Sequence, residues 1–203
     1  MTKVSNHNMW QTNRHNGRLA MSSAEKPVRS PIEELTDYIV NVPDYPRPGV
    51  QFKDITNLLK SPRAFRSAIG LLTAAFIGED IDAVVSIESR GFLIGAPVAF
   101  ALNTGVVPVR KKGKLPRSKI TTSYELEYGT DSLEMHTDGI SKEHRIVIID
   151  DVLATGGTAK AVSDLVASSG GKVVGYGFLI ELDELKGKEK LVRDAKLISL
   201  LHY

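Results

Sequence analysis

Unbroken apolar runs alternate along the chain with segments whose apolar residues recur at helical spacing. The runs predict strands, and a run without polar alternation predicts a strand buried on both faces of a sheet. Five strands are expected, at residues 83–87, 106–110, 146–149, 172–181 and 197–201. Four helices are expected between or before them, at residues 62–77, 92–102, 159–167 and 183–193. This alternation predicts an α/β fold with a mostly parallel, doubly wound sheet and a site at the carboxyl ends of the strands.

The first part of the chain is patterned more weakly. Residues 1–29 are rich in Asn, Ser, Thr and His and lack apolar periodicity, so we expect a mobile extension. A targeting peptide, or an alternative start at Met21, remains an alternative interpretation of this segment. Residues 30–203 are expected to form one domain, whose first helix begins at Ser30 and runs to about Val42.

Composition places the chain among ordinary globular proteins. It has 203 residues, of which 42% are hydrophobic and 25% charged. No apolar run approaches the 18 or so residues that a membrane-spanning helix needs, so we expect no membrane partner. The chain contains no cysteine, which excludes disulfides and thiolate chemistry and is compatible with a reducing compartment such as the cytoplasm.

The net charge of +2 does not indicate a nucleic-acid partner. Residues 1–30 hold five basic residues and one acidic residue, a net charge of +4, and the rest of the chain carries −2. The basic character therefore belongs to the N-terminal segment, and a basic footprint across the domain is not expected.

The most informative stretch follows the apolar run at 146–149. Asp150 and Asp151 come directly after it, and a segment of small and hydroxyl residues at 154–158 precedes the next helix. Glycines there allow backbone N–H groups to converge on an anion at a helix N-terminus, so the loop is predicted to hold a phosphate. Phosphate needs no carboxylate, so the two acids indicate vicinal hydroxyls or a divalent metal on the same ligand. A ribose 5-phosphate meets both requirements.

Residues 146–158 also resemble the phosphoribosyl-pyrophosphate motif of type I phosphoribosyltransferases. The resemblance implies that Asp150 and Asp151 face the 2- and 3-hydroxyls of the ribose. It further implies that the 5-phosphate is held by Ala154, Thr155, Gly156, Gly157 and Thr158.

A second resemblance covers residues 44–55, within a hood expected at about 43–57. The tract is similar to the hood of adenine phosphoribosyltransferases, which implies that Phe52 stacks on the purine. Gln51 and Lys53 flank it where the family reads the base edge, although Lys53 stands where family members often have Arg. Leu182 matches the apolar residue that the family places on the far face of the base.

The resemblance makes residues 88–91 the pyrophosphate loop, formed by Glu88, Ser89, Arg90 and Gly91, and implies a cis peptide between the first two. Residues 110–119 then carry six cations and no acid, which fits either a solvated loop or a mobile cover for a polyanion. We favour the cover. Arg90, Arg110, Lys111 and Lys114 are expected to stabilise the leaving pyrophosphate.

Residues 121–129 are similar to the flexible catalytic loop of the adenine enzymes. Glu127 matches the family's proposed general acid/base at the purine, and Tyr128 is expected to contact the substrate. Glu127 would donate or accept the proton of the incoming base.

Taken together, the resemblances imply a purine-salvage activity. Adenine and phosphoribosyl pyrophosphate would give AMP and pyrophosphate, with Mg²⁺ held mainly by substrate oxygens and water, and with no metal ligand set supplied by the protein. The family also implies a homodimer. Two alternatives remain, namely a phosphoribosyltransferase for another base and a non-catalytic, nucleotide-sensing regulator with the same fold.

Overall fold

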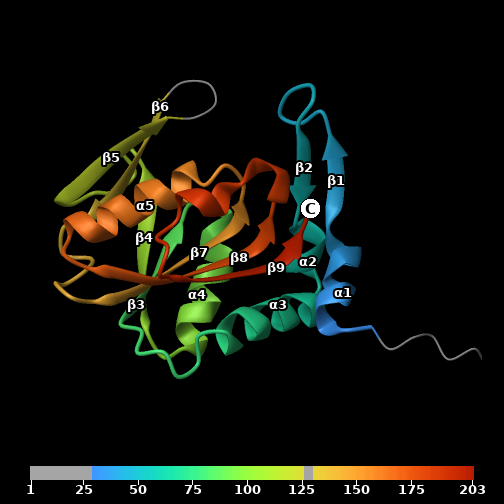
Figure 1. The fold of residues 1–203 in the computed structure, drawn as a ribbon, viewed down its shortest axis with the longest axis horizontal. Coiled ribbons are helices and arrows are strands. Elements are labelled where there is room, and N and C mark those ends of the chain that lie inside the picture. The colour runs from blue at the N-terminus through green and yellow to red at the C-terminus, as the bar shows by residue number, and fades with distance from the viewer. Residues whose placement is uncertain (1–28, 126–129) are drawn as a thin grey trace, which may run out of the picture.

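The computed structural model describes residues 29–125 and 130–203, and within them seven strands form one central sheet (Figure 1). The strands are β3 (Ala83–Ile87), β4 (Gly105–Lys111), β5 (Lys119–Glu125), β6 (Thr130–His136), β7 (Arg145–Leu153), β8 (Lys172–Glu181) and β9 (Lys196–His202). Their order is β5-β6-β4-β3-β7-β8-β9. The five strands from β4 to β9 in this order pair in parallel, whereas β5 and β6 pair antiparallel at one edge. The mostly parallel α/β sheet predicted from the sequence is confirmed.

Helices cover both faces of this sheet, as Figure 1 shows. The longer ones are α3 (Pro62–Ala74), α4 (Arg90–Ala101) and α5 (Gly157–Ser168). Side chains of α3 and α4 pack with Val147 and Ile149 of β7 in one core cluster, and α5 packs with Ile146 and Ile148 in the other. The side chains of these four consecutive β7 residues, 146–149, are all fully buried. The unbroken apolar run therefore faces two cores, which confirms the sequence interpretation of a strand covered on both sides.

The predicted N-terminal helix through Val42 was wrong beyond its first turns. Helix α1 (Pro31–Leu35) has the expected Ser30 cap, but it passes through a 3₁₀ turn, η1 (Thr36–Tyr38), into strand β1 (Val40–Pro43). This strand forms an antiparallel hairpin with β2 (Gln51–Asp54), in which Val42 pairs with Phe52. Pairing with a strand distant in sequence overrides a modest local helix preference. A short helix, α2 (Thr56–Lys60), follows the hairpin.

Of the flexible loop expected at 121–129, residues 121–125 belong to β5, which pairs with β6, and residues 126–129 lie outside the described part. The strands pair along their whole length, from Lys119 opposite His136 to Glu125 opposite Thr130. No strand was predicted here because β5 buries few apolar side chains, so its alternation is faint in the sequence. Leu133 and Met135 of β6 are both buried in the core.

The remaining corrections concern element ends. The helix expected at 183–193 is two 3₁₀ turns, η2 (Asp183–Leu185) and η3 (Gly187–Lys190), separated by Lys186 with a left-handed φ of 52°. Strand β7 continues through both aspartates instead of stopping before them. The peptide between Glu88 and Ser89 is cis, as expected, and so is the one between Tyr45 and Pro46. Among the described helices, none combines the length and apolar character needed to cross a membrane.

Candidate active site

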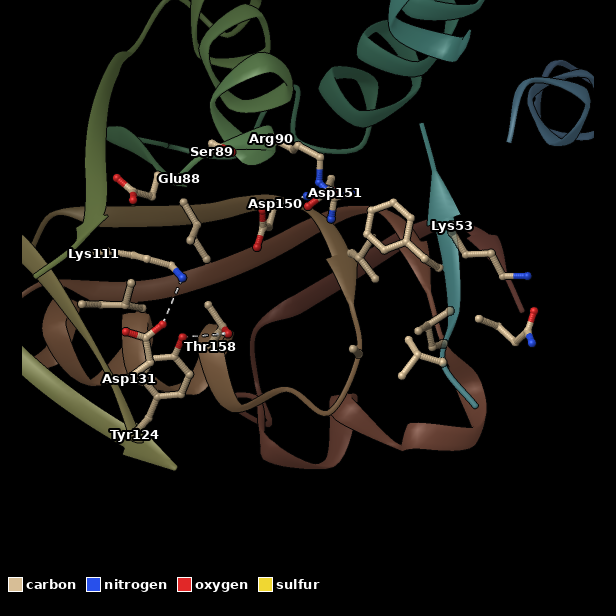
Figure 2. Close-up of a pocket in the computed structure, with 18 residues that line it drawn as sticks. Lys53, Glu88, Ser89, Arg90, Lys111, Tyr124, Asp131, Asp150, Asp151 and Thr158 are labelled. Atoms are coloured by element: carbon tan, nitrogen blue, oxygen red, sulfur yellow. Dashed lines mark hydrogen bonds and ion pairs between the residues drawn. The ribbon is translucent and has the colours of Figure 1, made fainter. Parts of the chain in front are cut away.

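A cavity of about 550 Å³ opens where the connections from two neighbouring strands diverge (Figure 2). Strands β3 and β7 lie side by side in parallel, and β4 lies on the far side of β3. This is the topological switch point at which open α/β sheets bind ligands. The carboxyl end of β3 supplies Glu88, Ser89 and Arg90, and the end of β7 supplies Asp150 and Asp151. The volume of the cavity suits a small-molecule ligand.

Arg90 and the two aspartates form the charged centre of the cavity. Nε of Arg90 lies 2.7 Å from Oδ2 of Asp151, which is only 5% exposed. Burial raises the pKa of Asp150 well above its usual value, and the neighbouring Asp151 charge raises it further. Burial also raises the pKa of Asp151, although the Arg90 guanidinium opposes that shift. Two adjacent carboxylates are thus poised to accept hydrogen bonds from a ligand that carries hydroxyl groups.

Gly91 allows the first turn of α4 to approach β7. A Cβ at Gly91 would lie 2.5 Å from Oδ1 of Asp150, a distance that real Cβ atoms do not tolerate. The same Oδ1 accepts a hydrogen bond from the backbone N–H of Asp151 at 2.9 Å. Gly91 does not line the cavity itself, so its place is behind the carboxylate that does.

The predicted phosphate loop connects β7 to α5 and turns sharply at Gly156. Gly156 has a left-handed φ of 75° and caps α5, and a Cβ there would overlap the backbone carbonyl of Gly187. Ala154 and Thr158 line the main cavity, while residues 154–158 together line a smaller hollow of about 80 Å³ at the start of the helix. A helix N-terminus with free N–H groups and a positive dipole end favours an anion.

The hairpin of β1 and β2 forms the wall expected for a base. Gln51, Phe52 and Lys53 of β2 line the cavity together with Leu182, which follows β8. Tyr45 packs edge-on against the Phe52 ring with centroids 5.1 Å apart, and Lys53 Nζ lies 4.1 Å from the Tyr203 ring centroid. The sequence-predicted hood residues and Leu182 are therefore brought to one cavity with the aspartates.

The basic run at 110–119 ends β4, forms a turn and leads into β5, and several contacts hold it, while its role as a mobile cover stays a prediction. Arg110 Nε lies 2.6 Å from Oε2 of Glu88, and its Nη1 donates to the backbone carbonyl of Lys114 at 3.1 Å. Buried Glu134 accepts from the N–H of Gly113 at 2.9 Å and lies 3.4 Å from Lys119 Nζ. Acids from other parts of the chain thus anchor this segment. They were invisible in the run because they are distant in sequence.

Comparison with known proteins gives a consistent result. A phosphoribosyl transferase domain family matches residues 54–201. A protein of Geobacter metallireducens named adenine phosphoribosyltransferase is 50% identical over 172 residues, which cover 85% of this chain and 100% of that protein. The chain belongs to the adenine phosphoribosyltransferase family.

Solved structures of the family agree in fold. The Rhodothermus marinus adenine phosphoribosyltransferase has a TM-score of 0.82 at 50% identity, covering 85% of this chain and 98% of that one. The Saccharomyces cerevisiae enzyme, complexed with an imino-altritol bisphosphate and adenine, has a TM-score of 0.79 at 39% identity, covering 84% and 98%.

The structure places the expected family residues unevenly around the cavity. Lys111 lines it, whereas Arg110 and Lys114 do not, and Lys114 contributes its backbone carbonyl to Arg110. Thr155, Gly156 and Gly157 line only the smaller hollow beside it. Glu127 and Tyr128 lie outside the described residues.

Six residues that line the cavity were not singled out from the sequence. Val50, Ile87 and Val152 adjoin residues that were, and the other three lie farther along the chain from any of them. Tyr124, Asp131 and Leu133 come from β5 and β6, where no strands were expected. Asp131 Oδ2 lies 3.3 Å from Lys111 Nζ, and Thr158 Oγ1 donates to the Tyr124 hydroxyl at 3.4 Å (Figure 2). The apolar alternation of Leu133 and Met135 was the available signal for this strand pair.

Proposed function

We propose that this protein transfers the 5-phosphoribosyl group from phosphoribosyl pyrophosphate to adenine, giving AMP and pyrophosphate in purine salvage. The observation that carries the proposal is a cavity that holds two adjacent carboxylates and an aromatic wall, with the glycine-containing loop at 154–158 lining a smaller hollow beside it. Those three features match a ribose, its 5-phosphate and a purine. The named relatives, and the yeast structure that contains adenine, support the same substrate.

At the ribose, Asp150 and Asp151 would accept hydrogen bonds from the 2- and 3-hydroxyls. The 5-phosphate would lie against residues 154–158, where backbone N–H groups of the α5 N-terminus and the hydroxyls of Thr155 and Thr158 donate. Together these contacts hold the anomeric carbon toward the base wall.

At the pyrophosphate, the leaving group gains negative charge as the anomeric carbon becomes oxocarbenium-like. Arg90 and Lys111 line the cavity and would stabilise that charge, and Arg110 and Lys114, which lie on the same segment as Lys111 but outside the lining, would add to the positive charge there. Glu127 would handle the purine proton, and Tyr128 would contact substrate, as the family resemblance implies.

At the base, Phe52 and Leu182 would hold the purine plane between them, while the strand around Gln51 and Lys53 reads its edge. Adenine presents an N6 donor beside an N1 acceptor, and hypoxanthine reverses both. An edge-reading backbone would therefore leave two buried polar groups mispaired with hypoxanthine.

Mg²⁺ would be held mainly by the substrate. Four carboxylates line the described part of the cavity, and three of them already lie beside a basic side chain, in the pairs Glu88–Arg110, Asp131–Lys111 and Asp151–Arg90. Such a donor set fits a cation that arrives with pyrophosphate oxygens and water better than a dedicated protein cage. The ion would neutralise pyrophosphate charge.

We further propose that the protein works as a homodimer in the cytoplasm. The proposal of a dimer rests on the family resemblance. The proposal of the cytoplasm rests on the lack of cysteine in the sequence and on substrates, adenine and phosphoribosyl pyrophosphate, that are soluble in water. Light scattering at several protein concentrations checks the dimer, and a single monomer mass throughout would contradict it.

The test of function is a pyrophosphate-release assay with adenine, hypoxanthine and guanine under the same conditions. Adenine should exceed hypoxanthine by at least roughly 10²-fold in kcat/KM, because each mispaired group costs about 1 to 3 kcal/mol. Phe52→Ala should weaken both bases and leave their ratio nearly unchanged, since stacking hardly distinguishes one purine from another.

Each alternative has its own outcome in that assay. Comparable values for adenine and hypoxanthine would contradict adenine specificity and leave phosphoribosyl transfer standing. Absence of pyrophosphate release with every base would favour the nucleotide-sensing regulator.

A further inference from the structure

Arg90 is held by two partners that belong to two different substrate subsites. Its Nε lies 2.7 Å from Oδ2 of Asp151, and its guanidinium carbon lies over the Phe52 ring, 4.8 Å from the centroid. Figure 2 shows the side chain reaching from the start of α4 toward Asp151. Under the proposed function, Asp151 receives the ribose and Phe52 receives the base. One side chain therefore covers part of both subsites before any substrate binds.

The contact with Phe52 lies inside the cavity. Arg90, Phe52 and Leu182 all line it, whereas Tyr45, which packs edge-on against the same ring, is not part of its lining. The guanidinium thus lies over one face of the ring where both residues line the cavity. A planar guanidinium stacks on an aromatic face much as a base does, so it competes with the base for that face.

Asp151 keeps Arg90 in this place. The Asp150 and Asp151 carboxylates are adjacent, Asp151 is buried and Asp150 partly buried, and the Arg90 charge opposes the rise in the pKa of Asp151. If the guanidinium left, the two carboxylates would face each other with less compensation. Arg90 is therefore expected to remain until another group satisfies Asp151.

We propose that Arg90 is a positioning residue that couples the two subsites, because it covers the base platform until a ribose engages Asp151. A ribose hydroxyl would donate to Asp151 in place of the Arg90 N–H, and the freed guanidinium would turn to the pyrophosphate. This inference rests on the proposed function, since it needs the ribose at Asp151 and the base at Phe52. It adds that the contact of Arg90 with Phe52 is what weakens adenine binding until the ribose site is filled.

The experiment measures adenine affinity by titration calorimetry on the full chain, with and without saturating ribose 5-phosphate, which cannot react with adenine. For the unaltered protein, ribose 5-phosphate should tighten adenine binding by about threefold to thirtyfold, the range of a cation–aromatic contact. Arg90→Ala should bind adenine more tightly by a similar factor without ribose 5-phosphate. It should also respond little when ribose 5-phosphate is added. A structural role alone would produce neither effect.

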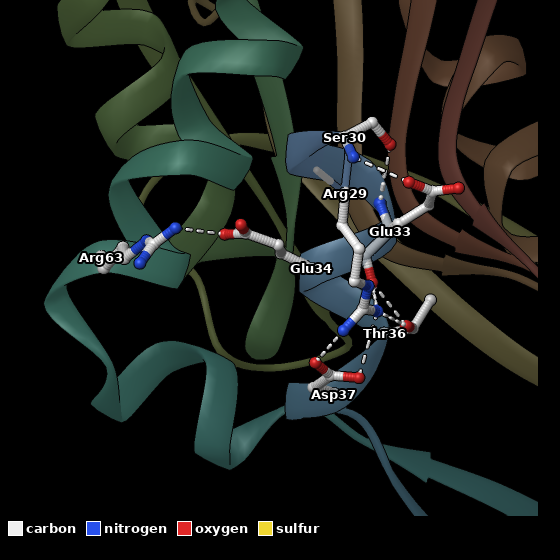
Figure 3. A network of polar contacts seen from close by, with 7 residues as sticks. All are labelled: Arg29, Ser30, Glu33, Glu34, Thr36, Asp37 and Arg63. Carbon is white, nitrogen blue, oxygen red and sulfur yellow. Dashed lines mark hydrogen bonds and ion pairs between the residues drawn. The ribbon is translucent and has the colours of Figure 1, made fainter. Parts of the chain in front are cut away.

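Two further variants keep the test decisive. Arg63→Ala removes the same charge from α3, where Arg63 is 76% exposed and pairs with Glu34 (Figure 3), and it should behave as the unaltered protein. Arg90→Gln fills more of the space than Ala and should show the same gain if Arg90→Ala does not fold. Melting curves establish folding for each variant.

A double variant separates covering of the ring from charge alone. In a Phe52→Leu background, Arg90→Ala should no longer tighten adenine binding, because the aromatic face is gone. The inference is overturned if that gain persists with Leu at position 52, if Arg90→Ala binds adenine no more tightly than the unaltered protein, or if its response to ribose 5-phosphate is undiminished. Lack of turnover with phosphoribosyl pyrophosphate and adenine would instead overturn the proposed function itself.

Discussion

Asp150 and Asp151 place two neighbouring carboxyl groups in a site where burial disfavours their charged forms and raises the pKa of each. The Asp151 side chain is buried and Asp150 is partly buried, and the ion pair with Arg90 is made by Asp151. Asp150 thus carries a carboxylate in a place that favours its neutral form. Active sites commonly retain such groups because their ligand, and not the fold, satisfies them.

Asp150→Asn is therefore expected to stabilise the ligand-free protein at pH 7. Because the pKa of Asp150 is raised in the folded protein, its contribution to the free energy of unfolding is fully present below the unfolded pKa, near 4. That contribution is lost as the pH rises through the higher folded pKa. The melting temperature should rise by a few degrees at pH 7, given roughly 2 to 4 °C for each kcal/mol, and by little at pH 4. Melting curves at both pH values measure this.

Asp138→Asn is the control for this change. Asp138 is exposed and pairs with Arg117, so its loss should alter stability by less than about 0.5 kcal/mol. A lower melting temperature for Asp150→Asn at pH 7 would show that the carboxylate stabilises the free fold. Asp150→Asn should also raise the KM for phosphoribosyl pyrophosphate by roughly tenfold or more, because a charged hydrogen-bond acceptor is lost.

Glu127→Gln tests the proton-handling role that the family resemblance implies. It should lower kcat by roughly 10²- to 10⁴-fold, with a much smaller change in affinity for phosphoribosyl pyrophosphate. Rapid-quench kinetics under conditions in which chemistry limits the rate is the suitable measurement. An unchanged rate would remove Glu127 from the mechanism.

At the scale of elements, the site depends on how closely backbones approach each other. The phosphate loop between β7 and α5 packs against the 3₁₀ turn η3, and the contact is made by Gly156 and Gly187 without side chains between them. The hairpin of β1 and β2 brings its wall from the other side. No single element contains the cavity, since strand ends, a helix start and two hairpins each supply part of it.

Gly156→Ala should disrupt this contact. A methyl group there would overlap the Gly187 carbonyl, and the positive φ adds its own strain, so a loss of about 2 to 4 kcal/mol is expected. Gly70→Ala on α3 is the matched control, because no heavy atom lies within 4 Å of its Cβ position. That change should stabilise by about 0.5 to 1 kcal/mol. Urea unfolding curves measure both, and equal effects would contradict the packing described.

For the whole molecule, the basic charge and the site belong to different regions. Arg29 is the first described residue, and it lies against Asp37, Thr36 and the backbone of Glu33 near α1 (Figure 3). The cavity lies at the strand ends and is lined by residues from Val50 onward. We therefore expect catalysis to depend on residues from Arg29 onward.

Deletion of residues 1–28 tests this separation. The deletion removes four basic residues and one acidic one, so the net charge falls from +2 to −1 and binding to a cation exchanger should weaken. The kcat/KM for adenine should stay within about twofold. A larger loss of activity would show that the N-terminal segment contributes to the site.

Local sequence signals were sufficient for the backbone of the site. The apolar run at 146–149 predicts a doubly covered strand because burial on both faces leaves no polar position. The Gly156-Gly157 pair before a helical pattern predicts an anion loop, since only glycine takes that turn at low cost. Family resemblance then brought Phe52 and Leu182 to the same ligand, and the structure places both beside the aspartates.

Tertiary structure alone decided which distant groups meet. Asp131 faces Lys111 and Tyr124 contacts Thr158 because β5 and β6 pair beside β4, a register that no short window of sequence contains. Val40–Pro43 is a strand because it has β2 as a partner, although the Ser30 cap begins a helix nearby. The placement of Arg90 over Phe52 likewise depends on a hairpin folding onto a strand end. Periodicity and turn chemistry act within a few residues, whereas these contacts are set by the packing of the whole chain.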